Sequence, residues 1–330
     1  MNAEESSSSD WVSLLRPFEP LLKGETWLGN IPLLILATGL SFLFLILLFR
    51  PIELLFPAKK QKFKRPDWWT DVFFFLGQYL IWGGLVFLAL QYGFGWLREI
   101  VPADFRAAVA DQPFWLQILE IILISDFCIY WAHRFQHRNA FLWRFHAVHH
   151  SAEHLDWLAA HREHPLDTIY TVGIINLPAF LAGFPLETLA GFLAFRGIWA
   201  IFIHSNVRLP IGPLRWFVGA PELHHWHHDR NRDAGNYANL SPLMDIAFGT
   251  YVCPDHEPES VGVNEPFPKS YVGQLLHPLG VPVKTQPPAD PPENHEIDPE
   301  DSPSNFCNSF RHRSTQRLCR FPPKSGKTGS

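Results

Sequence analysis

Long apolar segments alternate with short charged ones along most of the chain. Residues 31–49 contain no charge over 19 positions, close to the roughly 20 residues that an α-helix needs to cross a bilayer. A second uncharged segment covers residues 72–97, and a third covers residues 114–132 with Glu120 and Asp126 inside it. The pattern predicts an integral membrane protein built from helices.

Two further apolar segments, residues 168–185 and 186–203, are shorter and less regular. Arg196 lies in the second, and Pro178 and Gly183 interrupt the first. A buried hairpin of a soluble domain would also explain them, but the interruptions favour a broken or re-entrant pair in the membrane. We therefore expect an all-α fold with about four to five membrane-embedded helices.

Charged residues between the apolar segments predict the orientation of the chain. Residues 59–65 carry five cations, and short basic loops remain in the cytoplasm. Residues 98–112 would then lie outside, and the third span would return the chain to the cytoplasm near His133. A hairpin of the last two segments would bring His204 to the same side. We expect a cytoplasmic helical cap that follows the spans.

Composition supports a membrane protein and excludes other classes. Aromatic residues make up 15% of the chain and charged residues only 18%, and the formal net charge of −5 gives no reason to expect nucleic acid as a partner. The four cysteines form no CxxC motif, so burial in a reducing environment explains them better than disulfides. The first ten residues are polar and acidic, unlike a secretory signal. We expect a multi-pass protein of a bacterial inner membrane or the endoplasmic reticulum.

These patterns divide the chain into four parts. Residues 1–30 form a polar N-terminal segment, and residues 31–113 hold the first two spans and the basic loop. Residues 114–255 form the candidate catalytic domain. Residues 256–330 are rich in proline and polar residues, a composition typical of disorder, so we expect a disordered tail.

Histidine spacing indicates a metal site. The chain has 17 histidines, and eight of them form an HxxxH box and two HxxHH boxes: His133, His137, His146, His149, His150, His224, His227 and His228. Residues three and four apart share one face of a helix, so each box aims its imidazoles in a common direction. One tetrahedral site uses four ligands, so eight indicate two metals.

Four further histidines lie near or inside the boxes. His161, His164 and His204 are candidates for either ligands or hydrogen-bond partners of ligands. At about 100° per residue, His225 lies away from the arc that its three box neighbours share, so we expect it outside the metal site. His149 and His150 are adjacent and therefore also about 100° apart on a helix, so they can serve different metals.

Three functions remain open from these residues alone. Imidazole binds zinc, copper, iron and nickel, so a zinc-dependent membrane hydrolase is possible, although no glutamate stands inside the boxes. A metal transporter or sensor would place its ligands near the bilayer midplane, whereas these boxes follow the spans. Breaking an unactivated C–H bond requires activated O₂ on a metal, and a lipid-facing site favours this chemistry.

The boxes "HRFQH", "HAVHH" and "HHWHH" resemble those of the fatty acid hydroxylase and sterol desaturase superfamily, and the similarity covers residues 115–254. The resemblance implies an O₂-dependent hydroxylase or desaturase of lipid biosynthesis. It implies metal-ligand roles for the eight box histidines and for His164 and His204, and less directly for His161.

The resemblance also implies the cofactors and partners. They are two iron ions, cycling between Fe²⁺ and Fe³⁺, O₂ as co-substrate, and a lipid substrate from the bilayer. Since the sequence has no heme-binding or flavin-like segment, a separate electron donor protein is required, of a cytochrome b5-like, ferredoxin-like or reductase-like kind. Sterol and fatty acyl substrates both stay open, as do hydroxylation and desaturation.

Overall fold

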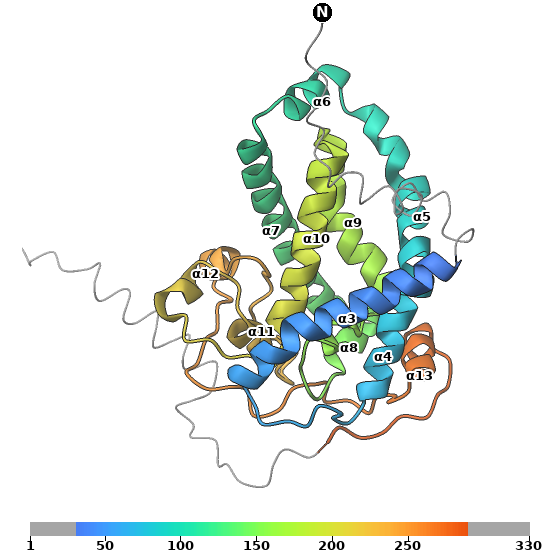
Figure 1. Ribbon diagram of the computed structural model, residues 1–330, viewed down its shortest axis with the longest axis vertical. Helices are drawn as coiled ribbons and strands as arrows, with labels where there is room; N and C mark the ends of the chain where they lie inside the picture. Colours follow the sequence, from blue (N-terminus) through green and yellow to red (C-terminus); the bar gives the residue numbers. More distant parts are fainter. Residues whose placement is uncertain (1–30, 290–330) are drawn as a thin grey trace, which may run out of the picture.

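The computed structural model describes residues 31–289, and the regular secondary structure in this part of the chain is helical (Figure 1). Within these residues the β-pairing consists of isolated bridges, such as the one between Pro57 and Val207. The all-α prediction is therefore confirmed. The predicted polar N-terminal segment and the last part of the predicted tail lie outside the described residues.

The described residues include four helical stretches long and apolar enough to cross a membrane. They are α3 (Ile31–Leu55), the stretch Trp68–Ile100, α7 (Phe114–Arg138) and α9 (Pro165–Ala182). A shorter apolar stretch, Thr188–His204, belongs to α10 (Leu186–His204). This matches the four to five membrane-embedded helices expected from the hydropathy pattern.

The stretch Trp68–Ile100 is a succession of helices. It contains α4 (Trp68–Gly77), a π-helical turn (Gln78–Trp82), α5 (Gly83–Phe94) and a 3₁₀ turn (Gly95–Ile100). The short α6 (Ala103–Ala110) then leads to α7. A π-helical turn inside a helix often occurs at a functional site, and Gln78 at its start contacts one of the candidate histidines described below.

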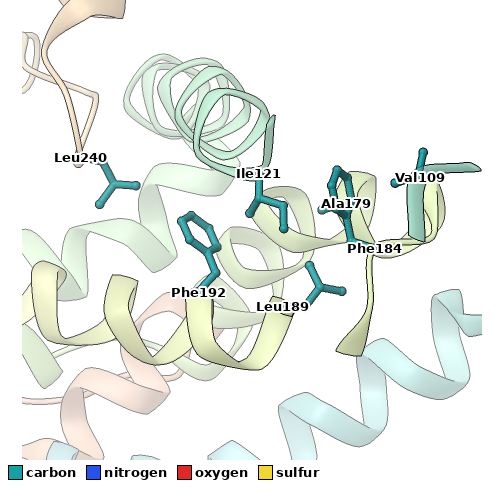
Figure 2. Packing of buried hydrophobic residues seen from close by; sticks show 7 residues of the cluster. All are labelled: Val109, Ile121, Ala179, Phe184, Leu189, Phe192 and Leu240. Carbon is teal, nitrogen blue, oxygen red and sulfur yellow. The ribbon is translucent and has the colours of Figure 1, made fainter. Parts of the chain in front are cut away.

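Helix α7 has two different faces. Leu119, Leu123 and Phe127, each four residues apart, are 47%, 51% and 50% exposed, as expected of side chains that face lipid. Ile121 on the other face is buried and packs in a core shared with α6, α9 and α10 (Figure 2). The core residues are Val109, Ile121, Ala179, Phe184, Leu189, Phe192 and Leu240.

Helices α9 and α10 are joined by a tight turn and each is continuous, in contrast to the broken helices that Pro178 and Gly183 led us to expect. Helix α9 runs through Pro178 without a break. A proline inside a helix removes one backbone hydrogen bond, but neighbouring helices make such prolines tolerable in membrane helices. The turn is made at Gly183, whose φ is 98°. A Cβ at Gly183 would lie 2.7 Å from Cα of Arg106, so glycine allows the close approach of α6 to this turn.

Short helices gather at one end of the bundle (Figure 1). They are α8 (Ala140–His150), α11 (Pro221–His227), α12 (Leu243–Phe248) and α13 (Tyr271–Leu276). The side chain of Asn139 begins α8 by accepting hydrogen bonds from the backbone N–H groups of Phe141 and Leu142. We call this end of the molecule the cap.

Residues 256–289 are folded against the domain, in contrast to the disordered tail predicted from residue 256. Phe267 is 5% exposed and packs in a cluster with Phe74 and Val148. The side chain of Gln274 is fully buried and donates to the carbonyl of Pro268 at 2.8 Å. The proline-rich and polar composition of the whole segment concealed these separate buried positions.

Buried ion pairs fix the basic loop to the cap. Arg65 Nη1 lies 2.7 Å from Asp71 Oδ2, and Arg65 Nη2 lies 2.6 Å from Asp156 Oδ1. Arg162 Nε lies 2.6 Å from the other oxygen of Asp71. The two carboxylates hold the pKa of Arg65 above its usual value despite burial, which opposes this. The network places the Arg162 backbone next to the histidines of α8.

Candidate metal centre

Nine histidines form two groups whose candidate ligand atoms lie within 4.8 Å of one another. Group one comprises His133 and His137 of α7, His146 and His150 of α8, and His227 of α11. Group two comprises His149 of α8, His204 of α10, His224 of α11, and His228 directly after α11. Helices α8 and α11 therefore supply side chains to both groups.

The helical period explains this division. His146 and His150 are four residues apart on α8 and lie on one face, whereas His149 is rotated by about 100° from His150. The same relation separates His227 from His228. Adjacent histidines consequently lie in different groups, as the spacing of "HAVHH" allows.

Five of the nine rings place Nδ1 against a backbone carbonyl. The pairs are His133 with Tyr237 at 2.9 Å, His137 with Arg232 at 2.6 Å, His149 with Arg162 at 3.1 Å, His204 with Ala200 at 2.6 Å, and His227 with Gly235 at 2.7 Å. A carbonyl only accepts, so Nδ1 carries the hydrogen in these rings. In the neutral ring, Nε2 then carries a lone pair and no hydrogen, and this tautomer can bind a metal through Nε2.

His146 reaches the same state through a carboxylate. Its Nδ1 donates to Asp167 Oδ2 at 2.9 Å, and Gln136 donates to the other oxygen of Asp167 at 2.6 Å. Asp167 was not among the residues expected from the sequence to belong to the site. An acid in an apolar helix, three residues after a candidate histidine, was the signal that could have indicated it.

Lone pairs face one another at short distance in both groups. The Nε2 atoms of His133 and His146 are 3.0 Å apart in group one, and those of His149 and His204 are 3.0 Å apart in group two. Since both atoms of each pair lack hydrogen, they repel one another unless a cation lies between them. The buried Nε2 atoms of His137 and His227 have no hydrogen-bond partner within residues 31–289. This donor set fits two metal ions.

The nitrogens of group two also lie close to one another. Nε2 of His204 lies 2.9 Å from that of His224 and 3.2 Å from that of His228. Together with His149, these side chains would be able to hold one metal ion.

Burial keeps the imidazoles neutral. Removal from water holds the pKa of His146, His150, His224, His227 and His228 well below the usual value, and the neighbouring histidines lower each of them further. A neutral imidazole is the required ligand, so no proton has to be displaced before a metal binds.

A buried carboxylate fixes the loop that orients group one. Asp245 accepts hydrogen bonds from the backbone N–H groups of Tyr237 and Ala238 at 2.8 and 2.9 Å, and from the Thr250 hydroxyl at 2.7 Å. This loop supplies the carbonyl of Tyr237, which holds His133. No local pattern in the sequence indicates this role of Asp245, because the contact depends on the folded loop.

His161, His164 and His225 lie outside both groups. His164 uses both nitrogens: Nδ1 accepts from Leu166 N–H at 3.1 Å and Nε2 donates to the Leu275 carbonyl at 3.1 Å. His161 directs Nδ1 to Gln78 Oε1 at 3.0 Å. His225 contacts Glu257 Oε2 at 2.6 Å and the Ser205 carbonyl at 3.0 Å. The position of His225 agrees with the helical register expected from the sequence.

A helical bundle with apolar spans and a buried centre of histidines defines a class of membrane proteins. The family profile described as fatty acid hydroxylase matches residues 118–250, a range that contains all nine grouped histidines. The chain belongs to the fatty acid hydroxylase family.

Three curated relatives are between 30% and 34% identical to this chain over the matched regions. An ornithine lipid hydroxylase, OlsE of Rhizobium tropici, is 32% identical over 173 residues, which cover 51% of this chain and 52% of that protein. The alkylglycerol monooxygenase of Homo sapiens is 34% identical over 165 residues, 49% of this chain and 34% of that protein. A putative methylsterol monooxygenase of Dictyostelium discoideum is 30% identical over 196 residues, 58% of this chain and 72% of that protein.

The chain thus spans about half of the ornithine lipid hydroxylase and about a third of the human alkylglycerol monooxygenase. No solved structure matches the chain.

Proposed function

We propose that this protein is a membrane-bound non-heme di-iron oxidoreductase that uses O₂ to hydroxylate or desaturate a lipid. The proposal rests chiefly on one observation: in each histidine group, two Nε2 atoms that carry lone pairs lie 3.0 Å apart. Membership of the fatty acid hydroxylase family supports lipid oxidation as the reaction class. The names of the relatives include an ornithine lipid, an alkylglycerol and a methylsterol as substrates of those proteins.

The proposed ligands are the nine grouped histidines, five for one iron and four for the other. His164 is left out of the set because both of its nitrogens are engaged with backbone groups. His161 is left out because it lies in neither group. Iron fits better than hydrolytic zinc, since a group of five imidazoles exceeds the tetrahedral preference of zinc.

Bound iron would supply the oxidising power that cleavage of an unactivated C–H bond requires. For hydroxylation, the substrate, O₂, two electrons and two protons give the alcohol and one water. The residues of the chain hold and orient the centre: backbone carbonyls and Asp167 fix the orientation of six of the nine rings. Eight of the nine histidines are buried. Burial keeps bulk water away from the reaction.

Lipid access is expected from the bilayer side. The exposed apolar face of α7 leads towards His133 and His137, near the end of the same helix. A lipid could therefore reach the histidines without leaving the membrane. We propose a multi-pass protein of a bacterial inner membrane or the endoplasmic reticulum, with the histidines on the cytoplasmic side. A separate electron donor protein would supply the electrons.

Metal content and oxygen use test the proposal together. Protein expressed with added iron and reconstituted in lipid nanodiscs should contain two metal ions per chain by elemental analysis. With a chemical reductant and extracted membrane lipids, it should consume O₂ and form products that carry ¹⁸O from ¹⁸O₂ or a new double bond. One metal or fewer after full loading, or lipid products formed equally without O₂, would contradict the proposal. The second result would favour a hydrolase.

A further inference from the structure

Two histidines of the centre differ from most of the others at Nδ1. In six of the nine rings this atom lies against a backbone carbonyl or Asp167. The Nδ1 atoms of His224 and His228 are instead buried without a hydrogen-bond partner within residues 31–289. Their Nε2 atoms lie 2.9 and 3.2 Å from Nε2 of His204. When a metal binds through Nε2, Nδ1 of each ring carries the hydrogen and needs an acceptor.

A small cavity lies beside His224. Its volume is about 10 Å³, close to the roughly 10–15 Å³ that one water molecule needs. The polar side chains of the lining belong to His224, Asn236, Asn239 and Asp245. A buried water molecule typically makes two to four hydrogen bonds, so the partners of these side chains decide whether the cavity suits one.

The lining combines one unsatisfied donor with one unsatisfied acceptor. Asn236 is fully engaged, since Oδ1 accepts from the N–H of Val252 and Nδ2 donates to the carbonyls of Leu223 and Val252. Asp245 accepts from three donors of its own loop, and its oxygens can accept a further hydrogen bond. Oδ1 of Asn239, however, is buried without a partner within residues 31–289. It is the acceptor that matches the donor on the histidine.

The backbone around Asn239 is fixed in place. Trp199 Nε1 donates to the Asn239 carbonyl at 3.2 Å, and the Gly219 N–H donates to the carbonyl of Leu240 at 2.8 Å. A Cβ at Gly219 would lie 1.9 Å from the Asn239 carbonyl oxygen, so glycine is required for this close approach. Because the backbone is held, the side chain of Asn239 stays at the cavity, and a buried oxygen without a partner costs free energy.

We propose that one water molecule occupies this cavity, accepts a hydrogen bond from Nδ1 of His224 and donates one to Oδ1 of Asn239. Neither atom has a partner, so they are not within hydrogen-bond distance of each other and a bridging molecule is required. Asp245 lines the same cavity and offers a second acceptor. Asn239 is thus a positioning residue of group two. The inference rests on the metal binding of the proposed function and is independent of lipid oxidation.

Size and chemistry exclude other occupants of the cavity. A cation would need a lone pair on Nδ1 of His224, but this atom carries the hydrogen when Nε2 binds a metal. A larger polar molecule exceeds the volume of about 10 Å³. An apolar group would leave both His224 and Asn239 unsatisfied. Water can accept from the first and donate to the second, as buried water does elsewhere in proteins.

A density map tests the water molecule directly. The full chain, loaded with metal in nanodiscs, should be imaged at a resolution that shows ordered solvent. We expect one solvent peak at about 2.7–3.2 Å from both His224 Nδ1 and Asn239 Oδ1. A map that shows other buried solvent but no peak between these two atoms would overturn the proposal.

Metal affinity tests the role of Asn239. The probe is Co²⁺, titrated into the metal-free full chain in competition with a chelator, and its visible absorption reports the ligands that bind it. In the His150→Ala background, which leaves group two complete, Asn239→Leu should weaken Co²⁺ binding about tenfold or more. In the His149→Ala background, which leaves group one complete, the same change should stay within about twofold. Equal weakening in both backgrounds, or none in either, would overturn the positioning role.

Two further variants control the result. Asn239→Asp keeps an acceptor at the same place and should retain the Co²⁺ affinity of its background, whereas a loss as large as that in Asn239→Leu would contradict the bridge. Asn176→Leu removes a side chain that donates to the Val172 carbonyl of its own helix and should leave the affinity unchanged. If Asn239→Leu does not fold, the solvent peak and Asn239→Asp decide the inference. If all variants behave as expected but the iron-loaded protein forms no lipid product, the role of Asn239 stands and the proposed lipid oxidation fails.

Discussion

The Nε2 atoms of His149 and His204 lie 3.0 Å apart, although both rings carry their hydrogen on Nδ1. The two residues are 55 positions apart in the chain and come from α8 and α10. The fold thus stabilises an arrangement that is repulsive by itself. A bound cation removes the repulsion, so metal binding and stability of this end of the molecule should be linked.

Adjacent histidines of α8 should serve different metals. His149→Ala and His150→Ala should each lower metal content from about two ions to about one and abolish activity, because each removes a ligand of a different group. Iron Mössbauer spectra of the two variants should retain different signals. Identical residual signals would show that the two groups are a single site.

The box "HHWHH" offers a test at neighbouring positions. His224→Ala, His227→Ala and His228→Ala should each lose metal and activity, since all three lie in the groups. His225→Ala should keep most of both, because His225 contacts Glu257 and the Ser205 carbonyl instead. Metal content and turnover at matched expression provide the measurement. If His225→Ala is inactive while His224→Ala is tolerated, the register of α11 is wrong.

Asp167 should affect the metal centre without binding to it. Asp167→Leu removes the acceptor that holds His146, and loss of such a partner typically lowers metal affinity by about 10–100-fold. Asp167→Asn retains an oxygen at the same position and should be milder. Competition with a chelator measures the affinity. Equal affinity in Asp167→Leu and the unchanged protein would contradict the role.

The buried ion pairs should dominate the stability of the cap. Asp71→Ala leaves Arg162 with a buried and uncompensated charge, and removal of one partner from such a pair costs about 3–5 kcal/mol. Arg215→Ala breaks an exposed pair with Asp255, whose side chain is 92% exposed, and should cost about 0–1 kcal/mol. Thermal unfolding in nanodiscs compares them. A similar loss in both variants would contradict a structural role of the network.

Truncation should separate the folded and unneeded parts of the predicted tail. A chain ending at residue 289 should keep metal content and activity, because the composition of residues 290–330 offers no apolar face to dock. A chain ending at residue 255 should not fold, because it loses Phe267 and Gln274 from the buried interior. Expression level and metal content of the two chains give the answer.

Labelling of intact cells tests the predicted orientation. Single cysteines placed in residues 98–112 should react with an impermeant maleimide, and those placed in residues 59–65 should not. Exposed lysines within residues 59–65 supply accessible positions for substitution. Reaction of the basic loop from outside would reverse the topology and place the histidines on the opposite side of the membrane.

Local patterns in the sequence determined the spans and the boxes. Apolar segments of bilayer length predicted helices correctly, because a backbone in lipid must satisfy its own hydrogen bonds. The four-residue and three-residue spacings of histidine, and the rotation that sets His225 apart, follow from the geometry of a single helix. None of these features needs knowledge of what packs against the helix.

Only the tertiary structure decided which histidines meet. His164 and His204 were equal candidates in the sequence, yet His204 lies against His149 and His224, while His164 begins α9 with both nitrogens bound to backbone groups. Asp167 became relevant only through its contact with His146. The buried positions of residues 256–289, such as Phe267, became evident only from their packing against α4 and α8. Each of these outcomes depends on contacts between distant segments, which spacing along one helix does not encode.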